Sequence, residues 1–337
     1  MCTKLNLIVD MGTSNTVIVE RKQGRVVEEP TLIAVKKVGG KMKTVAVGRE
    51  AYKMKTRRNK PQDVYYIYPV KDGNVVNQEA AVLLLKAFLE RITKPMFIRP
   101  QLDVICVVSC GLHTTERLEF ENVFYRLGVK SVTLLEAPIA AAAHVVAGCS
   151  FVVVMGGGVT DIAIVRENGI ATGCSISISG AKMAEAIYEY IYRHYNVTIS
   201  QARAEQLLNE RSTLSERENG ITQISGKDMA SGEYKKLEIS SQDIRNAILP
   251  IVDALLDSII AMSKICPDYL EDSIQHGGIQ LYGGLAGIHY LDSYLMDKLN
   301  LKVDVHPDVS SVAVGATTFF DDKAKLYRMI GLHGEQQ

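Results

Sequence analysis

Two short stretches of the chain repeat one pattern: an apolar run, Met-Gly, three further turn residues, Thr, and a second apolar run. The first stretch runs from Leu7 to Val19 and the second from Phe151 to Val165. At a constant offset of 144 positions the apolar run, Met, Gly and Thr coincide. Each copy is typical of a β-hairpin with a tight, Gly-containing turn. Two unrelated hairpins remain an alternative for either copy alone, but the shared Met-Gly-x-x-x-Thr favours a duplicated architecture with two phosphate-facing loops.

The length and charge of the chain limit what it can be. A chain of 337 residues can bury a sizeable core and predicts two domains or one bilobed unit. Lys+Arg and Asp+Glu both number 38, so no nucleic acid or other polyanion is expected as a partner. We find no uninterrupted apolar stretch near the roughly 18 residues that span a membrane, and no signal peptide before the first strand. The cysteines form no CxxC pair, which favours reduced thiols in a cytoplasmic protein.

Strands and helices alternate along the rest of the chain, which predicts an α/β protein. Apolar residues at helical spacing or capping residues predict five helices. One runs from Thr114, its N-cap, to Gly128 and one begins at Gly180; the others cover 77–92, 201–210 and 243–266. A buried strand is predicted at 104–108, and further strands are predicted at 132–135, 175–179 and 278–282. Residues 200–240 are more polar, and after the helix at 201–210 they show no clear apolar face. We expect them to belong to a smaller subdomain inserted into the second half.

One loop tip carries large apolar residues between cations. Met96 and Phe97 lie in the segment from Lys94 to Arg99, after the helix over 77–92. Such a tip either folds back onto the core or contacts an apolar partner, and the flanking cations are compatible with a membrane surface. The sequence leaves both interpretations open.

Four features taken together resemble the actin-like ATPase superfamily. They are the two glycine turns, the Glu136-Ala137-Pro138 junction and the Gly283-Gly284 turn. Their order and spacing match the bacterial shape-determining branch, the MreB/Mbl family, from residue 5 to about 325. Further matches are Pro69 to Gly73 and the helix that opens at Gly180.

The resemblance implies a fold, cofactors and a set of site residues. The fold is α/β: an actin-like bilobed fold of two duplicated RNase H-like lobes with a nucleotide cleft between them. The lobes are expected at 1–140, with a small subdomain at about 25–75, and at 141–337, with one at about 182–245. ATP and Mg²⁺ are the implied cofactors, with Asp10 holding Mg²⁺ through water. The implied nucleotide-binding residues are Asp10, Gly12, Thr13, Ser14, Asn15, Gly156, Gly157, Gly158, Val159, Glu205, Leu208, Gly283, Gly284, Leu285 and Ala286.

The chemistry of the turns agrees with this implication. Glycine-rich turns present backbone N–H groups to phosphate with little interference from side chains. The alternative for each glycine is a tight turn without a ligand. Three such turns in the family's order make that alternative weak.

The chain departs from the family where hydrolysis is concerned. Val154 and Ala137 occupy the positions of an aspartate that organises Mg²⁺ and a glutamate that positions the attacking water. Neither side chain accepts a hydrogen bond from water, so part of the phosphoryl-transfer chemistry is missing. Asp161 keeps an acid where the family has glutamate, and Glu136 is expected to point away from the site. Near the nucleotide, Val159 replaces a threonine, Leu208 a lysine and Leu285 a glycine.

Three hypotheses follow. The first, which we favour, is an MreB-like cytoskeletal protein that binds ATP and forms membrane-associated filaments controlling cell shape, with weakened hydrolysis. It would be cytoplasmic and peripheral at the inner membrane surface, with itself, an intact paralogue and shape-determining membrane proteins as partners. The second is an active ATPase with an altered set of groups. The third is a non-polymerising actin-fold nucleotide-binding regulatory module.

Overall fold

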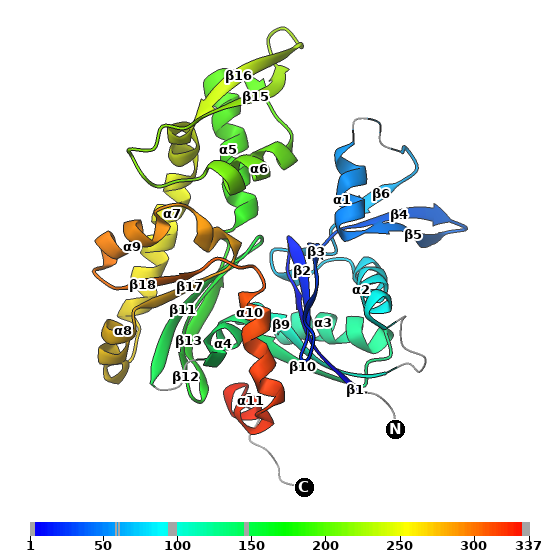
Figure 1. Cartoon of the computed structure of the whole chain (residues 1–337), viewed down its shortest axis with the longest axis vertical. Helices are drawn as coiled ribbons and strands as arrows, with labels where there is room; N and C mark the ends of the chain where they lie inside the picture. Colours follow the sequence, from blue (N-terminus) through cyan, green and yellow to red (C-terminus); the bar gives the residue numbers. More distant parts are fainter. Residues whose placement is uncertain (1–3, 58, 60, 94–99, 145–147, 332–337) are drawn as a thin grey trace.

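Two five-stranded sheets with one topology form the centre of the protein (Figure 1). The computed structural model describes residues 4–331 except 58, 60, 94–99 and 145–147. The first sheet has the order β10-β9-β1-β2-β3 and the second the order β13-β12-β11-β17-β18. In each, three antiparallel strands are extended by two parallel ones. The strands of the first sheet are β1 (Lys4–Met11), β2 (Asn15–Glu20), β3 (Gly24–Pro30), β9 (Gln101–Val108) and β10 (Ser131–Glu136); those of the second are β11 (Cys149–Met155), β12 (Thr160–Arg166), β13 (Gly169–Ile176), β17 (Ile279–Tyr282) and β18 (Val303–His306).

The predicted duplication holds at the level of single residue pairs. Asp10 pairs with Val17 in the β1–β2 hairpin, and Val154 pairs with Asp161 in the β11–β12 hairpin. Val154 lies 144 positions after Asp10, and Asp161 lies 144 positions after Val17, as the sequence repeat predicts. The two hairpins therefore have the same register.

Buried strands explain why both sheets form. Every residue of β11 is buried, as expected of a Val-rich strand covered on both faces. One face packs under α5 (Gly180–Tyr195) and α7 (Ser241–Lys264). The other face meets the first sheet in a shared cluster with α4 (Ala137–Ala141) and α10 (Ser311–Ala316). The first sheet is covered by α2 (Gln78–Thr93) and α3 (Thr114–Arg126). The two lobes thus share the core that supports both glycine turns.

Each lobe carries a small sheet at the same end of the molecule (Figure 1). In the first lobe β4 (Ile33–Val38), β5 (Lys41–Val47) and β6 (Tyr65–Ile67) pack with α1 (Gly48–Thr56). In the second, β14 (Val197–Thr198), β15 (Ile221–Asp228) and β16 (Tyr234–Ser240) accompany α6 (Gln201–Arg211). The division of the chain at residue 140 stays a prediction.

Several sequence-based boundaries are corrected by the structure. The polar passage after α6 forms the β15–β16 hairpin. Of the strand expected at 175–179, only Ser175 and Ile176 are strand, as the end of β13, and Ser179 is the N-cap of α5. His113 is the N-cap of α3, and Thr114 is its first residue. The remaining elements are β7 (Val70–Lys71), β8 (Asn74–Val75), η1 (Ala142–His144), η2 (Asp268–Leu270), α8 (Glu271–Gly277), η3 (Gly284–Gly287), α9 (Leu291–Leu299), η4 (Thr317–Phe320) and α11 (Lys323–Met329).

Within the described residues, only α7 is long and apolar enough to cross a membrane by length and composition. Its buried residues recur along one stripe, including Ile244, Ile248, Leu255 and Ile259, and pack in the second lobe. This is the arrangement of an amphipathic helix that packs one face against a globular lobe.

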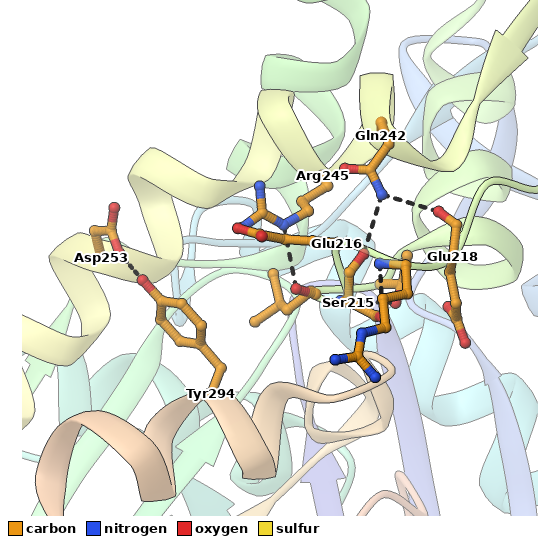
Figure 2. A network of polar contacts seen from close by, with 10 residues as sticks. Ser215, Glu216, Glu218, Gln242, Arg245, Asp253 and Tyr294 are labelled. Atoms are coloured by element: carbon orange, nitrogen blue, oxygen red, sulfur yellow. Dashed lines mark hydrogen bonds and ion pairs between the residues drawn. The ribbon is translucent and has the colours of Figure 1, made fainter.

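A polar network fixes the segment that follows α6 (Figure 2). Gln242 of α7 donates through Nε2 to the carbonyls of Ser215 (3.1 Å) and Glu218 (2.9 Å). Arg245 donates from Nε to the carbonyl of Leu214 at 3.1 Å. The Leu214 N–H in turn donates to the carbonyl of His289 at 2.9 Å, just beyond η3. The segment that follows α6 is therefore anchored both to α7 and to the segment after the Gly283-Gly284 turn.

Candidate functional site

The two glycine turns of the hairpins contact each other between the lobes. Gly12 N donates to Asn15 O at 3.0 Å, and Gly156 N donates to Val159 O at 2.9 Å, so both turns close in the same way. A Cβ added at Gly157 would lie 1.9 Å from Ser14 Oγ. The same addition at Gly158 would lie 2.1 Å from Thr13 Oγ1. Glycine is required at both positions because the turns approach this closely, and we name the region around the two turns the interlobe site.

A third turn, between β7 and β8, joins the interlobe site. Gly73 N donates to Thr13 Oγ1 at 3.1 Å, and a Cβ at Gly73 would lie 3.3 Å from Val159. Asp72 and Gly73 both have positive φ, which an Asp-Gly pair adopts readily. We did not predict these residues as site residues, although the Asp-Gly pair lies inside the matched Pro69–Gly73 segment.

Asp10 and Asp161 both face this region. Burial, and then the charge of Asp161, raise the pKa of Asp10 to about 7. Burial also raises the pKa of Asp161 to about 6, although the N–H of Cys110 donates to its Oδ1 at 3.0 Å and lowers it. Two carboxyl groups on facing hairpins therefore repel each other when both are ionised.

Glu136 lies nearer to the site than we expected. Its Oε1 accepts from Gly111 N at 2.9 Å and is 4.0 Å from Arg117. Its charge also raises the pKa of Asp161. The loop at Cys110 and Gly111 therefore holds Asp161 and Glu136 on successive N–H groups. That Glu136 points away from the site stays a prediction.

Positions 137 and 154, where the family resemblance implies an acid, lie in apolar surroundings. Ala137 is buried as the first residue of α4, in the cluster shared by the lobes. Val154 pairs with Asp161 on one side and with Tyr282 on the other, and the Tyr282 ring packs against the same cluster. Tyr282 is stacked on His306 with ring centroids 4.4 Å apart. The valine therefore has an acid beside it on the neighbouring strand.

The residues predicted beside the nucleoside lie together in the second lobe. Leu208, Leu285 and Ala286 are buried in one cluster with the helices of that lobe. Gly283 has a φ of +95°, and a Cβ there would lie 2.3 Å from the carbonyl of Met155. This close approach by itself requires glycine at 283. Nucleotide contact by these residues stays a prediction.

Glu205 is half-buried on α6 of the second lobe. After burial, its charge is the next cause that raises the pKa of the Tyr52 hydroxyl, which lies on α1 of the first lobe. Lys55 of α1 is close enough to lower the pKa of Glu205, against the effect of burial.

A Mg²⁺ ion held through water fits this set of groups. Across the described residues, no three His, Cys, Asp or Glu side chains are grouped so as to hold a metal directly. Asp10 is a single carboxylate between the turns, and a cation beside it would offset its repulsion with Asp161. The predicted membrane contacts Met96 and Phe97 lie outside the described residues.

An open groove of about 730 Å³ lies elsewhere, on the first lobe. Four of its charges are paired: Arg91 Nη1 lies 2.6 Å from Glu29 Oε1, and Arg25 forms an ion pair with Glu28. It contains none of the predicted site residues and is lined by Arg25, Val26, Val27, Glu28, Glu29, Arg49, Glu50, Lys53 and Arg91.

Paired sheets of one topology, with a glycine turn from each meeting between the lobes, define an actin-like fold. The MamK double helical filament supports this fold, with a TM-score of 0.77 over 95% of this chain and 99% of that chain at 17% identity. The crystal structure of MreB5 of Spiroplasma citri bound to ADP superposes with a TM-score of 0.87, at 28% identity, over 98% of this chain and 99% of MreB5.

The family described as MreB/Mbl protein matches residues 4–328, and the chain belongs to that family. The cell shape-determining protein MreB of Escherichia coli (strain K12) is 30% identical over 98% of this chain and 95% of its own length. The cell shape-determining protein Mbl of Bacillus subtilis (strain 168) is also 30% identical, over 94% of this chain and 96% of its own length. The predicted family and fold are confirmed.

Proposed function

We propose that this chain binds ATP with Mg²⁺ at the interlobe site and forms filaments at the inner face of the cytoplasmic membrane that control cell shape. We further propose that it hydrolyses ATP slowly. The observation that carries the proposal is the pair of contacting glycine turns, which retain the acid at Asp10 and have valine at 154. The proposal draws support from MreB5, solved bound to ADP and to AMPPNP.

Different residues of the chain would contact different parts of the nucleotide. Backbone N–H groups of 12–15 and 156–158 would hold the phosphates, since such turns bind anions. Glu205 and the 283–286 turn would contact the nucleoside from the second lobe. Bound Mg²⁺ would neutralise phosphate charge beside Asp10.

Slow hydrolysis follows from the groups at two positions. The methyl groups of Ala137 and Val154 neither accept a proton nor orient a water molecule. A general base or water-positioning group contributes typically about 10²–10⁴-fold to the rate. Binding and cleavage are therefore separable here, since the turns that hold phosphate are intact.

Two measurements on the purified protein test the proposal. Electron microscopy with Mg·ATP and lipid vesicles should show filaments on the membrane. Single-turnover phosphate release should be at least tenfold slower than that of an intact relative under the same conditions. Dispersed particles would favour the non-polymerising regulatory module, and normal turnover would contradict the loss of chemistry.

One observation favours a second candidate, an active ATPase with altered groups. Asp161 and Glu136 lie near each other beside the turns, and the pKa of Asp161 is raised to about 6, a value suited to accepting a proton near neutral pH. Asp161→Asn keeps the acceptor for Cys110 N and removes the charge. Unchanged residual phosphate release in this variant excludes Asp161 as the base, and its loss favours the second candidate.

A further inference from the structure

The β4–β5 hairpin projects from the small subdomain of the first lobe and carries charges of one sign (Figure 1). The hairpin at the same end of the second lobe, β15–β16, also has lysines, but its strands include the acids Asp228 and Glu238. In β4–β5 the strands and the Gly-Gly turn between them contain no acid and have lysine at Lys36, Lys37, Lys41 and Lys43. The cationic charge is therefore a property of this hairpin and is not shared by its counterpart.

Three of these lysines lie on one face of the hairpin. Lys36 pairs with Lys43, and Val38 pairs with Lys41, across the β4–β5 ladder. Cross-strand partners, and residues two apart on a strand, lie on the same side of a sheet. Lys36, Val38, Lys41 and Lys43 therefore form one surface, which we name the hairpin face, and the Val38 side chain on it is 59% exposed.

The charges on the hairpin face are only partly compensated within the chain. Lys36 Nζ lies 2.7 Å from Asp63 Oδ2. Lys41 and Lys43 are exposed and form no ion pair with any residue that the structure describes. Like charges directly opposite each other destabilise a ladder, so Lys36 opposite Lys43 lowers the stability of the hairpin, and an anion bound from outside would offset this repulsion.

Protection of a sheet edge explains part of this charge. Strand β5 is the edge of its three-stranded sheet, and lysines on an edge strand prevent pairing with another chain. This accounts for Lys41 and Lys43, but it explains neither Lys36 on the central strand β4 nor the exposed Val38. Cations around an exposed apolar side chain, without an acid, fit the headgroups and acyl boundary of an anionic lipid layer.

The hairpin is also connected to the predicted membrane contact. Helix α2 packs against both β4 and β5, and Met42 on the other face of the hairpin joins the cluster that α2 covers. The chain leaves α2 at Thr93 and continues directly into the segment that contains Met96 and Phe97. One helix therefore links the hairpin to the segment that we predict to contact the membrane.

We propose that the hairpin face is a second membrane-contact site, which binds the headgroups of an anionic lipid layer through its lysines and places Val38 at the acyl boundary. This inference rests on the proposed function, because it takes the filament to lie on a membrane. The attraction is electrostatic, so it requires anionic lipid and weakens as the salt concentration rises.

The test is co-sedimentation of the full chain with two kinds of vesicle, phosphatidylcholine alone and phosphatidylcholine mixed with phosphatidylglycerol. Lys41→Gln with Lys43→Gln removes the two unpaired charges and keeps long polar side chains. Each lysine near an anionic surface corresponds to about a fivefold change in affinity, so binding to the anionic vesicles should weaken at least tenfold. Binding to the neutral vesicles should stay within about twofold, since they offer no charge to the lysines.

Matched variants separate this role from unfolding and from net charge. Lys41→Arg with Lys43→Arg keeps both charges and should bind anionic vesicles as the wild type does. Lys227→Gln with Lys236→Gln removes two exposed lysines from the β15–β16 hairpin and should also bind normally. Because the loss of like charges relieves repulsion, the Lys41→Gln, Lys43→Gln chain should unfold in urea at the wild-type midpoint or above it.

Wild-type binding of the Lys41→Gln, Lys43→Gln chain to anionic vesicles would overturn the inference and leave the proposed function intact. Loss of filaments without lipid in this variant, with vesicle binding retained, would also overturn it and would assign the hairpin face to contact between copies of the chain. If the wild-type chain binds neither kind of vesicle, the membrane location in the proposed function falls, and the inference falls with it.

Discussion

Val154 and Asp161 face each other across the β11–β12 ladder, at the place where Asp10 and Val17 face each other across β1–β2. The two hairpins have one register, yet the acid lies on the first strand in one and on the second strand in the other. Asp161 and Glu136 are held by the N–H groups of Cys110 and Gly111. The second hairpin therefore keeps an acid on its second strand, at 161, and has valine at 154 on its first strand.

An acid placed at 154 should lower the free energy of unfolding when no nucleotide is bound. Val154→Asp places a carboxylate opposite Asp161 and beside the Tyr282 ring, where like charges in a buried ladder repel. We expect the free energy of unfolding to fall by roughly 2–4 kcal/mol, measured by urea denaturation. Val154→Asn introduces a side chain of the same shape as Asp without the charge, so its free energy of unfolding should fall by less. Equal falls in the two variants would exclude charge repulsion as the cause.

Val154→Asp should raise the rate of ATP hydrolysis when it is combined with Ala137→Glu. Ala137→Glu with Val154→Asp returns both acids, so single-turnover phosphate release with Mg·ATP should rise at least tenfold over the wild-type rate. No gain would mean that more of the site than these two positions has changed.

Stability without nucleotide should depend on pH through Asp161. Its pKa rises from 3.8 to about 6 on folding, so the folded state binds this proton more tightly than the unfolded chain. The contribution of Asp161 to the free energy of unfolding is fully present below about pH 4 and is lost as the pH rises through 6. This loss is about 3 kcal/mol for two pKa units. Urea denaturation between pH 4 and 7.5 should show this decline. Asp161→Asn should make the decline smaller and leave the part due to Asp10, whose pKa is also raised, to about 7. An unchanged slope would assign the whole decline to Asp10 and other groups.

The sequence predicted the paired hairpins because Met, Gly and the apolar strands recur with one spacing, which the ladder registers reproduce. The β15–β16 hairpin was missed because the inward positions of β15, which alternate in burial with exposed ones, hold Thr222, Ile224, Gly226 and Asp228, so the strand has no alternating apolar pattern. The hydrogen bond of Glu136 to Gly111 depends on a loop distant in the chain. Local periodicity carries no information about such contacts.

The close approach of the two turns makes Gly157 sensitive to a single methyl group. Gly157→Ala would place its Cβ 1.9 Å from Ser14 Oγ, so the turns must separate. We expect a loss of about 1–3 kcal/mol in the free energy of unfolding and at least tenfold weaker nucleotide binding, measured by denaturation and by titration with a fluorescent analogue. Gly277→Ala is the control because no atom lies within 4 Å of its added Cβ. Equal effects of the two changes would contradict contact between the turns as the reason for glycine at 157.

The predicted membrane contact at Met96 and Phe97 can be tested without knowing its geometry. Replacing both residues by Ser removes two large apolar side chains from a tip flanked by Lys94 and Arg99. Because burial of each such side chain contributes roughly 1.5–3 kcal/mol, co-sedimentation with anionic liposomes should fall by at least tenfold. Leu118→Ser, at an exposed position of α3 in the same lobe, is the control and should bind as the wild type does. Liposome binding that survives the double change, together with a lower thermal midpoint, would instead indicate that the tip packs against the core of the first lobe.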